Sequence, residues 1–299
     1  MRITNNLATQ LAISNFTTVR AQLDAAQSKV TTGHSFEKAS QDPTAAASVM
    51  QSESQLSALT QYTRNVGTAQ RRVSAEDSAL SQLNDLLTRA KELAMSQATD
   101  TATPQTRAAA GAEVNQLLAQ AVAISNTKDG DEFLFGGNNS TVAPYTANTA
   151  GAAYTFSVNA ASGGARQIEI NRGQRIDSAH DGAQVFGDAN SGILKTLQDL
   201  AGALNGGTRD TVAATLTTID TSMSQIQSLI GETGARANTL DITKSNITAL
   251  SNQLKAFKSD IQDVDLETAM TELVSRQTAY QAALSATSRV LNLSITSYL

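Results

Sequence analysis

A heptad pattern of apolar residues most constrains what this chain can fold into. Apolar side chains hold the core positions through six consecutive repeats, and only Glu76 interrupts them. Such a pattern indicates coiled-coil packing. It predicts one long helix from Thr44 to Ala98, with Asp42 as its N-cap and Pro43 at its first position. Its members are Leu59, Val66, Val73, Leu80, Leu87 and Ala94, with Tyr62, Ala69, Leu83 and Ala90 between them.

Other helices are predicted on both sides of this one. A helix from about Gln105 to Asn126 follows Pro104 and should fold back antiparallel, because the connection is short. Helical spacing resumes at Ile193, and apolar residues then recur every three or four positions to the end of the chain. The last two series are offset by two residues at 263–266, so a break is predicted there. The segment before the long helix also has a stripe, formed by Phe16, Val19, Leu23, Ala26 and Val30.

The middle of the chain has a different character. From 138 to about 187 it is rich in Gly, Asn, Ala and Thr, and Tyr154–Val158 and Gln167–Asn171 alternate as strands do. The predicted fold is therefore mainly α, a long antiparallel helical bundle or coiled coil formed by the N- and C-terminal regions. A small β-rich domain is inserted between them.

Composition argues against several classes of function. Aromatic residues make up only 4% of the chain, which favours long packed helices, and the net charge of -5 is dispersed without a basic patch for nucleic acid. The chain has no cysteine and two histidines, His34 and His180, in no metal-binding spacing. The acidic turn at 129–132 lacks the ligand spacing of a calcium loop, and His180-Asp181 has no nucleophile motif. We expect no enzyme, no cofactor, no metal site and no membrane insertion, since no run approaches ~20 apolar residues.

Both ends of the chain carry apolar stripes, although chain ends are usually polar and frayed. We therefore expect the terminal helices to assemble with partners. Isolated helices of this kind are marginal in water, and burial of ~1.5–3 kcal/mol per large apolar side chain comes only on docking. The expected assembly interface is Leu7, Leu11, Phe16, Val19, Leu23, Leu266, Leu273, Leu284 and Leu291. The expected intramolecular seam is Leu59, Val66, Val73, Leu80, Leu87, Val212, Ile219 and Ile226.

Specific residues at both ends resemble the bacterial flagellin family. The N-terminal match is Val30–Ala47, and the C-terminal matches are Gly234–Asp241, Ser259–Leu266 and Leu293–Leu299. The resemblance covers roughly two-thirds of the chain and implies three domains. These are an inner core of terminal helices (1–31 with 255–299) that is disordered until assembly, a long-helix bundle (32–137 with 186–254), and a small β-containing outer domain (138–185).

Two segments, Thr127–Gly137 and Ile176–Phe186, are similar to the members of this family that join hook to filament. The resemblance thus implies a structural subunit of the hook-filament junction. Because Leu293–Leu299 is at least as similar to filament subunits, a filament flagellin or flagellin-like minor subunit is the alternative. A less favoured one is a surface flagellin homologue that binds polysaccharide through its exposed middle domain.

The resemblance also implies the partners and the location of the protein. The implied partners are copies of itself, the neighbouring hook-side junction protein, filament flagellin, and an export chaperone on the C-terminal helix. The N-terminus, Met1–Leu7, has no secretory signal pattern. Family members nevertheless reach the extracellular flagellum through the type III export channel without a cleaved signal peptide.

Overall fold

The structure is a computed structural model, and it describes residues 2–148, 155–159 and 164–296. In the terminal helices its description of side chains covers residues 7 and 10–32 and residues 266–289. The helices are α1 (Arg2–Thr32), α2 (Pro43–Gln97), α3 (Pro104–Ser125), α4 (Gly182–Phe186), α5 (Ile193–Gly206), α6 (Arg209–Gln262) and α7 (Leu266–Thr296). The strands are β1 (Lys128–Asp129), β2 (Glu132–Phe133), β3 (Tyr145–Asn148), β4 (Thr155–Val158), β5 (Gln167–Asn171) and β6 (Gln174–Asp177). The mainly helical fold with a small β insertion is confirmed.

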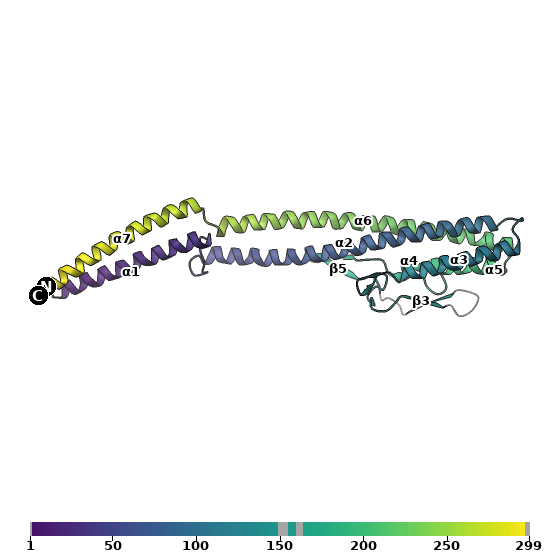
Figure 1. Cartoon of the computed structure of the whole chain (residues 1–299), viewed down its shortest axis with the longest axis horizontal. Coiled ribbons are helices and arrows are strands. Elements are labelled where there is room, and N and C mark those ends of the chain that lie inside the picture. The colour runs from purple at the N-terminus through teal and green to yellow at the C-terminus, as the bar shows by residue number, and fades with distance from the viewer. Residues whose placement is uncertain (1, 149–154, 160–163, 297–299) are drawn as a thin grey trace. The chain divides into compact units, whose positions relative to one another are not determined.

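The chain forms two compact units, residues 1–58 with 249–299 and residues 59–248. In the first unit, α1 and α7 lie side by side (Figure 1), and the start of α2 is joined to the end of α6 by an ion pair between Glu53 and Lys258 at 2.6 Å. The α2 helix begins as predicted, because the Asp42 carboxylate accepts a hydrogen bond from the backbone N–H of Ala45 at 2.9 Å. The predicted break is also present, since α6 ends at Gln262 and α7 begins at Leu266.

In the second unit α2 and α6 run antiparallel. Gln70 donates a hydrogen bond to Asp241 at 2.7 Å, and Lys91 forms an ion pair with Asp220 at 2.7 Å. The two contacts are 21 residues apart on each helix, in opposite directions, so the helices stay in register between them. This register buries the apolar faces of both helices against each other and against α3 and α5.

The α3 helix folds back along α2, as the short connection predicts. Thr103 caps it, accepting from the N–H of Thr106 at 3.2 Å, and Arg89 of α2 pairs with Glu113 of α3 at 2.8 Å. A break between α5 and α6, which the apolar spacing after Ile193 does not indicate, falls at 207–208. Gly207 is close to the Ala203 carbonyl there, so that an added Cβ would lie 2.5 Å from it.

Three antiparallel two-stranded sheets, β1-β2, β3-β4 and β5-β6, form the insertion. An aromatic cluster holds part of it against the helices. Phe135 and Phe186 pack edge to face with centroids 5.0 Å apart, and Tyr145 lies 5.7 Å from Phe186. All three side chains are buried in the same core as the heptad leucines. The insertion therefore shares one core with the helical bundle.

Candidate assembly surface

The terminal helices α1 and α7 pack through a narrow strip of side chains. Phe16 and Tyr280 lie with ring centroids 5.3 Å apart, and Leu23 and Ala26 are buried. Polar contacts flank this strip. Lys29 forms an ion pair with Glu272 at 3.4 Å, and Arg276 donates to Gln22 at 2.8 Å. These contacts orient the pair antiparallel.

The residues expected to form the assembly interface fall into two groups. Leu23 is buried, and Phe16, Val19 and Leu273 are half-buried in the α1–α7 contact. The others face outward, with exposed fractions of 55% for Leu7, 56% for Leu11, 53% for Leu266 and 51% for Leu284. The side chain of Leu291 lies outside the described residues. The role of the set in assembly stays a prediction.

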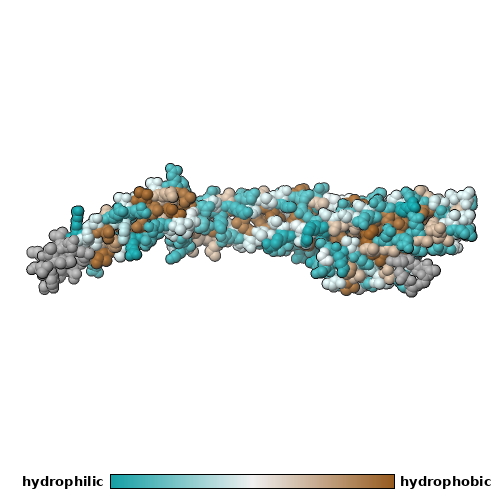
Figure 2. Space-filling model, viewed as in Figure 1, coloured by the Kyte–Doolittle hydropathy of each residue, from teal (hydrophilic) through white to brown (hydrophobic). Residues whose placement is uncertain are grey.

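Exposed apolar residues on α7 extend beyond the predicted set. Met270 and Val274 follow Leu266 at steps of four, which places all three on one face of the helix, and each is more than half exposed. Figure 2 shows hydrophobic side chains gathered at the start of this helix. Val274 escaped prediction because it lies outside the strict heptad series. A spacing of i, i+4, i+8 from Leu266 would have identified it. These three residues and Leu284 are called the α7 stripe below.

The residues expected to form the intramolecular seam all lie in the interior. Six of them are fully buried in the second unit, namely Val66, Leu80, Leu87, Val212, Ile219 and Ile226, and Val73 is nearly so. Leu59 is buried as well. Full burial of such side chains contributes ~1.5–3 kcal/mol each, so that this seam supplies much of the stability of the bundle.

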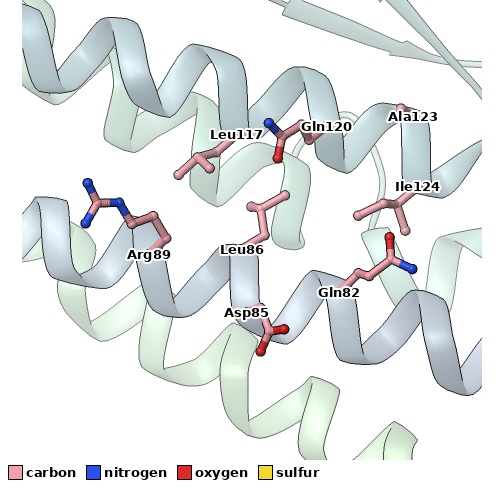
Figure 3. A pocket seen from close by; sticks show the side chains of 8 residues that line it. All are labelled: Gln82, Asp85, Leu86, Arg89, Leu117, Gln120, Ala123 and Ile124. Atoms are coloured by element: carbon pink, nitrogen blue, oxygen red, sulfur yellow. The ribbon is translucent and has the colours of Figure 1, made fainter.

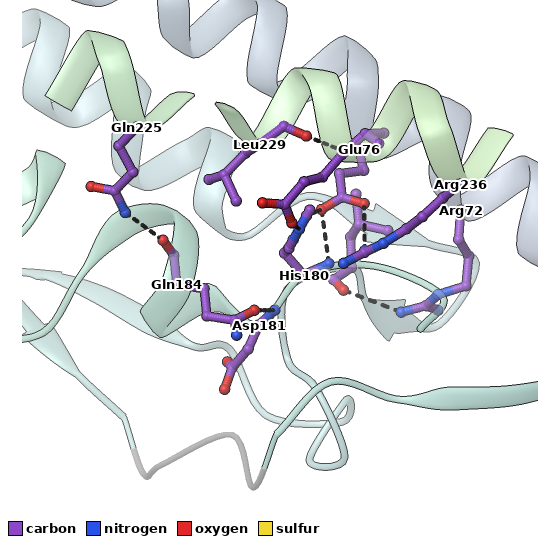
Figure 4. A network of polar contacts seen from close by, with 11 residues as sticks. Arg72, Glu76, His180, Asp181, Gln184, Gln225, Leu229 and Arg236 are labelled. Carbon is purple, nitrogen blue, oxygen red and sulfur yellow. Dashed lines mark hydrogen bonds and ion pairs between the residues drawn. The ribbon is translucent and has the colours of Figure 1, made fainter. Parts of the chain in front are cut away.

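Glu76, which interrupts the heptad pattern, lies at the centre of a buried ionic network (Figure 4). Its side chain is fully buried, and its Oε1 lies 2.6 Å from Nδ1 of His180 and 2.8 Å from the backbone N of His180. The other ring nitrogen, Nε2, is 3.1 Å from Oε2 of Glu232. Arg236 approaches Glu76 Oε2 only to 3.9 Å, so it contributes charge without a hydrogen bond.

An ionised carboxylate only accepts hydrogen bonds, so when Glu76 and Glu232 are both ionised the two ring nitrogens of His180 both donate and the ring is positively charged. Burial acts to lower the pKa of His180, but the hydrogen bonds and charges of Glu76 and Glu232 outweigh it and raise the pKa. The network joins the turn before α4 to α2 and α6. It is a structural tie between these three parts of the second unit.

The acidic turn at 129–132 is neutralised by arginines. Arg72, nearly fully buried, lies 3.2 Å from Glu132 and 4.0 Å from Asp129, and Arg166 also contacts Glu132. Burial lowers the pKa of Arg72, as does the neighbouring charge of Arg166. Among the described residues no group of three or more acidic or histidine side chains is placed to hold a metal ion. The turn therefore anchors β1 and β2 to α2.

A shallow groove lies between α2 and α3 (Figure 3). Leu86, Leu117 and Ile124 form its apolar part, and Arg89 closes one end through its pair with Glu113. Its remaining lining residues are Gln82, Asp85, Gln120 and Ala123. Leu86 and Leu117 are already buried in the core, so little apolar surface is left there for a ligand.

None of the described helices is long and apolar enough to cross a membrane.

Comparison with known proteins assigns the helices at both ends. Residues 3–140 match the bacterial flagellin N-terminal helical region, and residues 216–299 match the bacterial flagellin C-terminal helical region. The flagellar hook-associated protein 3 of Escherichia coli (strain K12) is 24% identical over 319 residues, which cover 99% of this chain and 98% of that protein. The flagellar filament 30.7 kDa core protein of Treponema maltophilum is 20% identical over 284 residues, covering 95% of this chain and 93% of that protein.

A solved structure has the same fold. The flagellar hook-associated protein 3 of Legionella pneumophila superimposes with a TM-score of 0.61 at 15% identity. The match covers 71% of this chain and 98% of that one.

The paired helices and the inserted sheets define a mainly helical structural protein with a small β insertion. The chain belongs to the bacterial flagellin family, as its N- and C-terminal helical regions both match in the expected order. It is accordingly a component of the extracellular flagellum, where it assembles with other flagellar proteins. The predicted resemblance to this family is confirmed.

Proposed function

We propose that this chain is the subunit that joins the hook of the flagellum to its filament. The observation that carries the proposal is a contact between the two segments that resemble junction members of the family. Phe135 of the first packs edge to face on Phe186 of the second, and the N–H of Gly182 donates to the carbonyl of Phe135 at 3.0 Å. An added Cβ at Gly182 would lie 2.9 Å from that carbonyl, so the close approach needs glycine. The similarity to hook-associated protein 3 along nearly all of both chains supports the same role.

The mechanism is docking of the terminal helices. The α7 stripe and the outward Leu7 and Leu11 are exposed in the single chain, where they gain nothing from the hydrophobic effect. Contact with neighbouring subunits removes them from water, and each fully buried side chain contributes ~1.5–3 kcal/mol to the docked state. In this proposal the terminal helices form the inner core domain, the long helices the next domain, and residues 138–185 the outer domain.

The proposal includes the partners and the route of export. The subunit contacts copies of itself, a hook-side junction protein on one side and filament flagellin on the other. It leaves the cell through the flagellar export channel without a cleaved signal peptide, bound before export by a chaperone on α7. A chain without cysteine suits this route, because no thiol can be misoxidised outside the cell.

The test is to delete the gene in the source bacterium and to locate the protein by immunogold electron microscopy in the complemented strain. We expect the deleted strain to release flagellin without holding a filament, and gold to mark one band beside the hook. Purified subunits should not form long filaments under conditions that suit flagellin. Gold along the whole filament would contradict the proposal and support a filament subunit, a role that the similarity to the Treponema maltophilum filament protein keeps open.

A further inference from the structure

A small cavity lies between α2, the β1–β2 hairpin and the start of β5. Its volume is about 210 Å³, below the ~300 Å³ at which pockets for drug-sized ligands begin, so it suits a single small chemical group. It is called the arginine cavity below. The polar side chains that line it are Thr68, Arg71, Arg72, Asp129, Glu132 and Arg166.

The walls of the arginine cavity are held in place by direct contacts. Nη1 of Arg72 lies 3.2 Å from Oε2 of Glu132, and Nη2 donates to the carbonyl of Leu134 at 3.2 Å. These two contacts fix the hairpin on α2. The side chain of Asn65 donates to the carbonyl of Glu169 at 2.7 Å, which fixes β5 on the same helix. The cavity is therefore formed by the fold of the chain itself.

Arg72 has more hydrogen-bond donors than its protein contacts use. Its side chain is 3% exposed, and its Nε is buried without a hydrogen-bond partner among the described residues. Buried donors are nearly always paired in native proteins, with protein groups, water or ions. The guanidinium group of Arg71 and the hydroxyl of Thr68 also have no partner in the part of the chain that the structure describes. Three lining residues thus have donors left for a ligand.

The side chains around the cavity have an excess of one positive charge, because three arginines accompany two carboxylates. Glu132 is shared by Arg72 and Arg166. Asp129 lies 4.0 Å from Arg72, too far for a hydrogen bond. Burial, and then the charge of Arg166, lower the pKa of Arg72, so two positive groups are held close together in a poorly solvated place. One further negative charge would balance the excess.

We propose that the arginine cavity binds a small oxyanion, a carboxylate or phosphate group, through the guanidinium groups of Arg71, Arg72 and Arg166. The hydroxyl of Thr68 supplies a neutral donor beside them. Arginine presents its N–H donors in a planar fork that matches the oxygens of both groups. Two sources have this chemistry, namely free inorganic phosphate and the carboxylate of an acidic sugar, whose hydroxyls can donate to Asp129. The cavity lies wholly within residues 59–248, so this inference does not depend on the proposed docking of the terminal helices.

Binding should strengthen the attachment of the insertion to the helices. Arg71 and Arg72 belong to α2, whereas Arg166 directly precedes β5, so one bound oxyanion contacts both parts of the second unit. A ligand that binds only the folded chain raises its stability by mass action. The midpoint of thermal unfolding should therefore rise with the oxyanion concentration and not with sodium chloride at equal ionic strength.

The test is calorimetric titration of the purified full-length chain with sodium phosphate and, separately, with sodium glucuronate, at constant ionic strength in sodium chloride. We expect one equivalent of at least one of these anions to bind. Arg71→Gln removes a charge-assisted hydrogen bond and should weaken binding about tenfold. Thr68→Val removes the hydroxyl while it keeps the shape and the net charge, and should weaken binding about fivefold.

Arg64→Gln is the matched control for the loss of charge. Arg64 lies two helical turns before Arg71 on α2, is exposed like it, and is not among the residues that line the cavity. The control should bind both anions like the wild type. Because Arg71 is exposed and has no partner in the described chain, Arg71→Gln should also unfold at the wild-type temperature in sodium chloride alone.

The two anions distinguish the two sources. Binding of phosphate alone would assign the cavity to free phosphate, binding of glucuronate alone would assign it to an acidic sugar, and binding of both would define a general oxyanion site. Binding of neither would overturn the inference. So would binding that Arg71→Gln and Thr68→Val leave unchanged. Binding that Arg64→Gln weakens as much as Arg71→Gln would overturn it too, because general surface charge would then explain the affinity.

Discussion

The buried ring of His180 is held directly against Glu76, with Nδ1 2.6 Å from Oε1, and Glu232 accepts from its other nitrogen at 3.1 Å. The two histidine contacts join the insertion to α2 and to α6. The charged groups that face the ring are Glu76 from α2 and Glu232 and Arg236 from α6, with Asp181 next to it in the chain. The network therefore depends on the proton that His180 carries.

The first prediction is a loss of stability at high pH. The pKa of His180 is raised in the folded protein, so the folded state binds the proton more tightly than the unfolded chain. The stabilisation is fully present below the ordinary pKa of 6.5 and is lost as the pH rises through the raised value. Urea unfolding at a series of pH values should show the free energy of unfolding falling in this range. His180→Gln should remove the fall, and His34→Gln, in the other unit, should retain it.

A second prediction concerns Glu76. Glu76→Leu completes the heptad pattern but leaves His180 and Arg236 without their buried partner. Removing one partner of a buried ion pair leaves the other charge buried and uncompensated. The free energy of unfolding should therefore fall by ~3–5 kcal/mol. Glu92→Leu is the control on the same helix, where the side chain is exposed, and should change stability by less than ~0.5 kcal/mol. A Glu76→Leu variant as stable as the wild type would show that the network contributes nothing.

Much of the helical fold follows from apolar periodicity. The heptads predict α2, Asp42 and Pro43 predict its start, and the offset at 263–266 predicts the break before α7. Each of these depends on residues near in sequence. The role of Glu76 could not be predicted, because its partner His180 lies 104 residues away and only the folded chain brings them together.

The candidate site was predicted less completely for a related reason. A stripe predicts which residues share a helix face, but not whether that face meets a neighbour in the same chain. Phe16 and Tyr280 meet within the chain, whereas Leu266 faces outward on the same unit. The three-domain division and the disorder of the terminal helices before assembly stay predictions.

The third prediction tests how the insertion is attached. The hydroxyl of buried Tyr145 lies 2.6 Å from the carbonyl of Gly187 and 2.9 Å from that of Gly182. Burial, with the charges of Asp181 and Asp188, raises the pKa of Tyr145, so the hydroxyl stays protonated and donates. Tyr145→Phe leaves both carbonyls without this donor and should lower the free energy of unfolding by ~1–3 kcal/mol. Tyr62→Phe on α2 is the control, and equal stability of the two variants would contradict the attachment.

The last prediction separates folding from assembly. Leu266→Ser and Val274→Ser change side chains of the α7 stripe that are 53% and 61% exposed, so each should alter the unfolding of the single chain by less than ~0.5 kcal/mol. If neighbouring subunits cover the stripe, each variant loses ~1.5–3 kcal/mol of docking free energy. Its affinity for the docking partner then falls at least about tenfold. The measurement is binding of labelled subunits to isolated hooks that carry the hook-side junction protein. Ile242→Ser on α6, 63% exposed, is the matched control for loss of an exposed apolar side chain, and it should bind like the wild type. Normal binding by both stripe variants would show that the α7 stripe is not the docking surface.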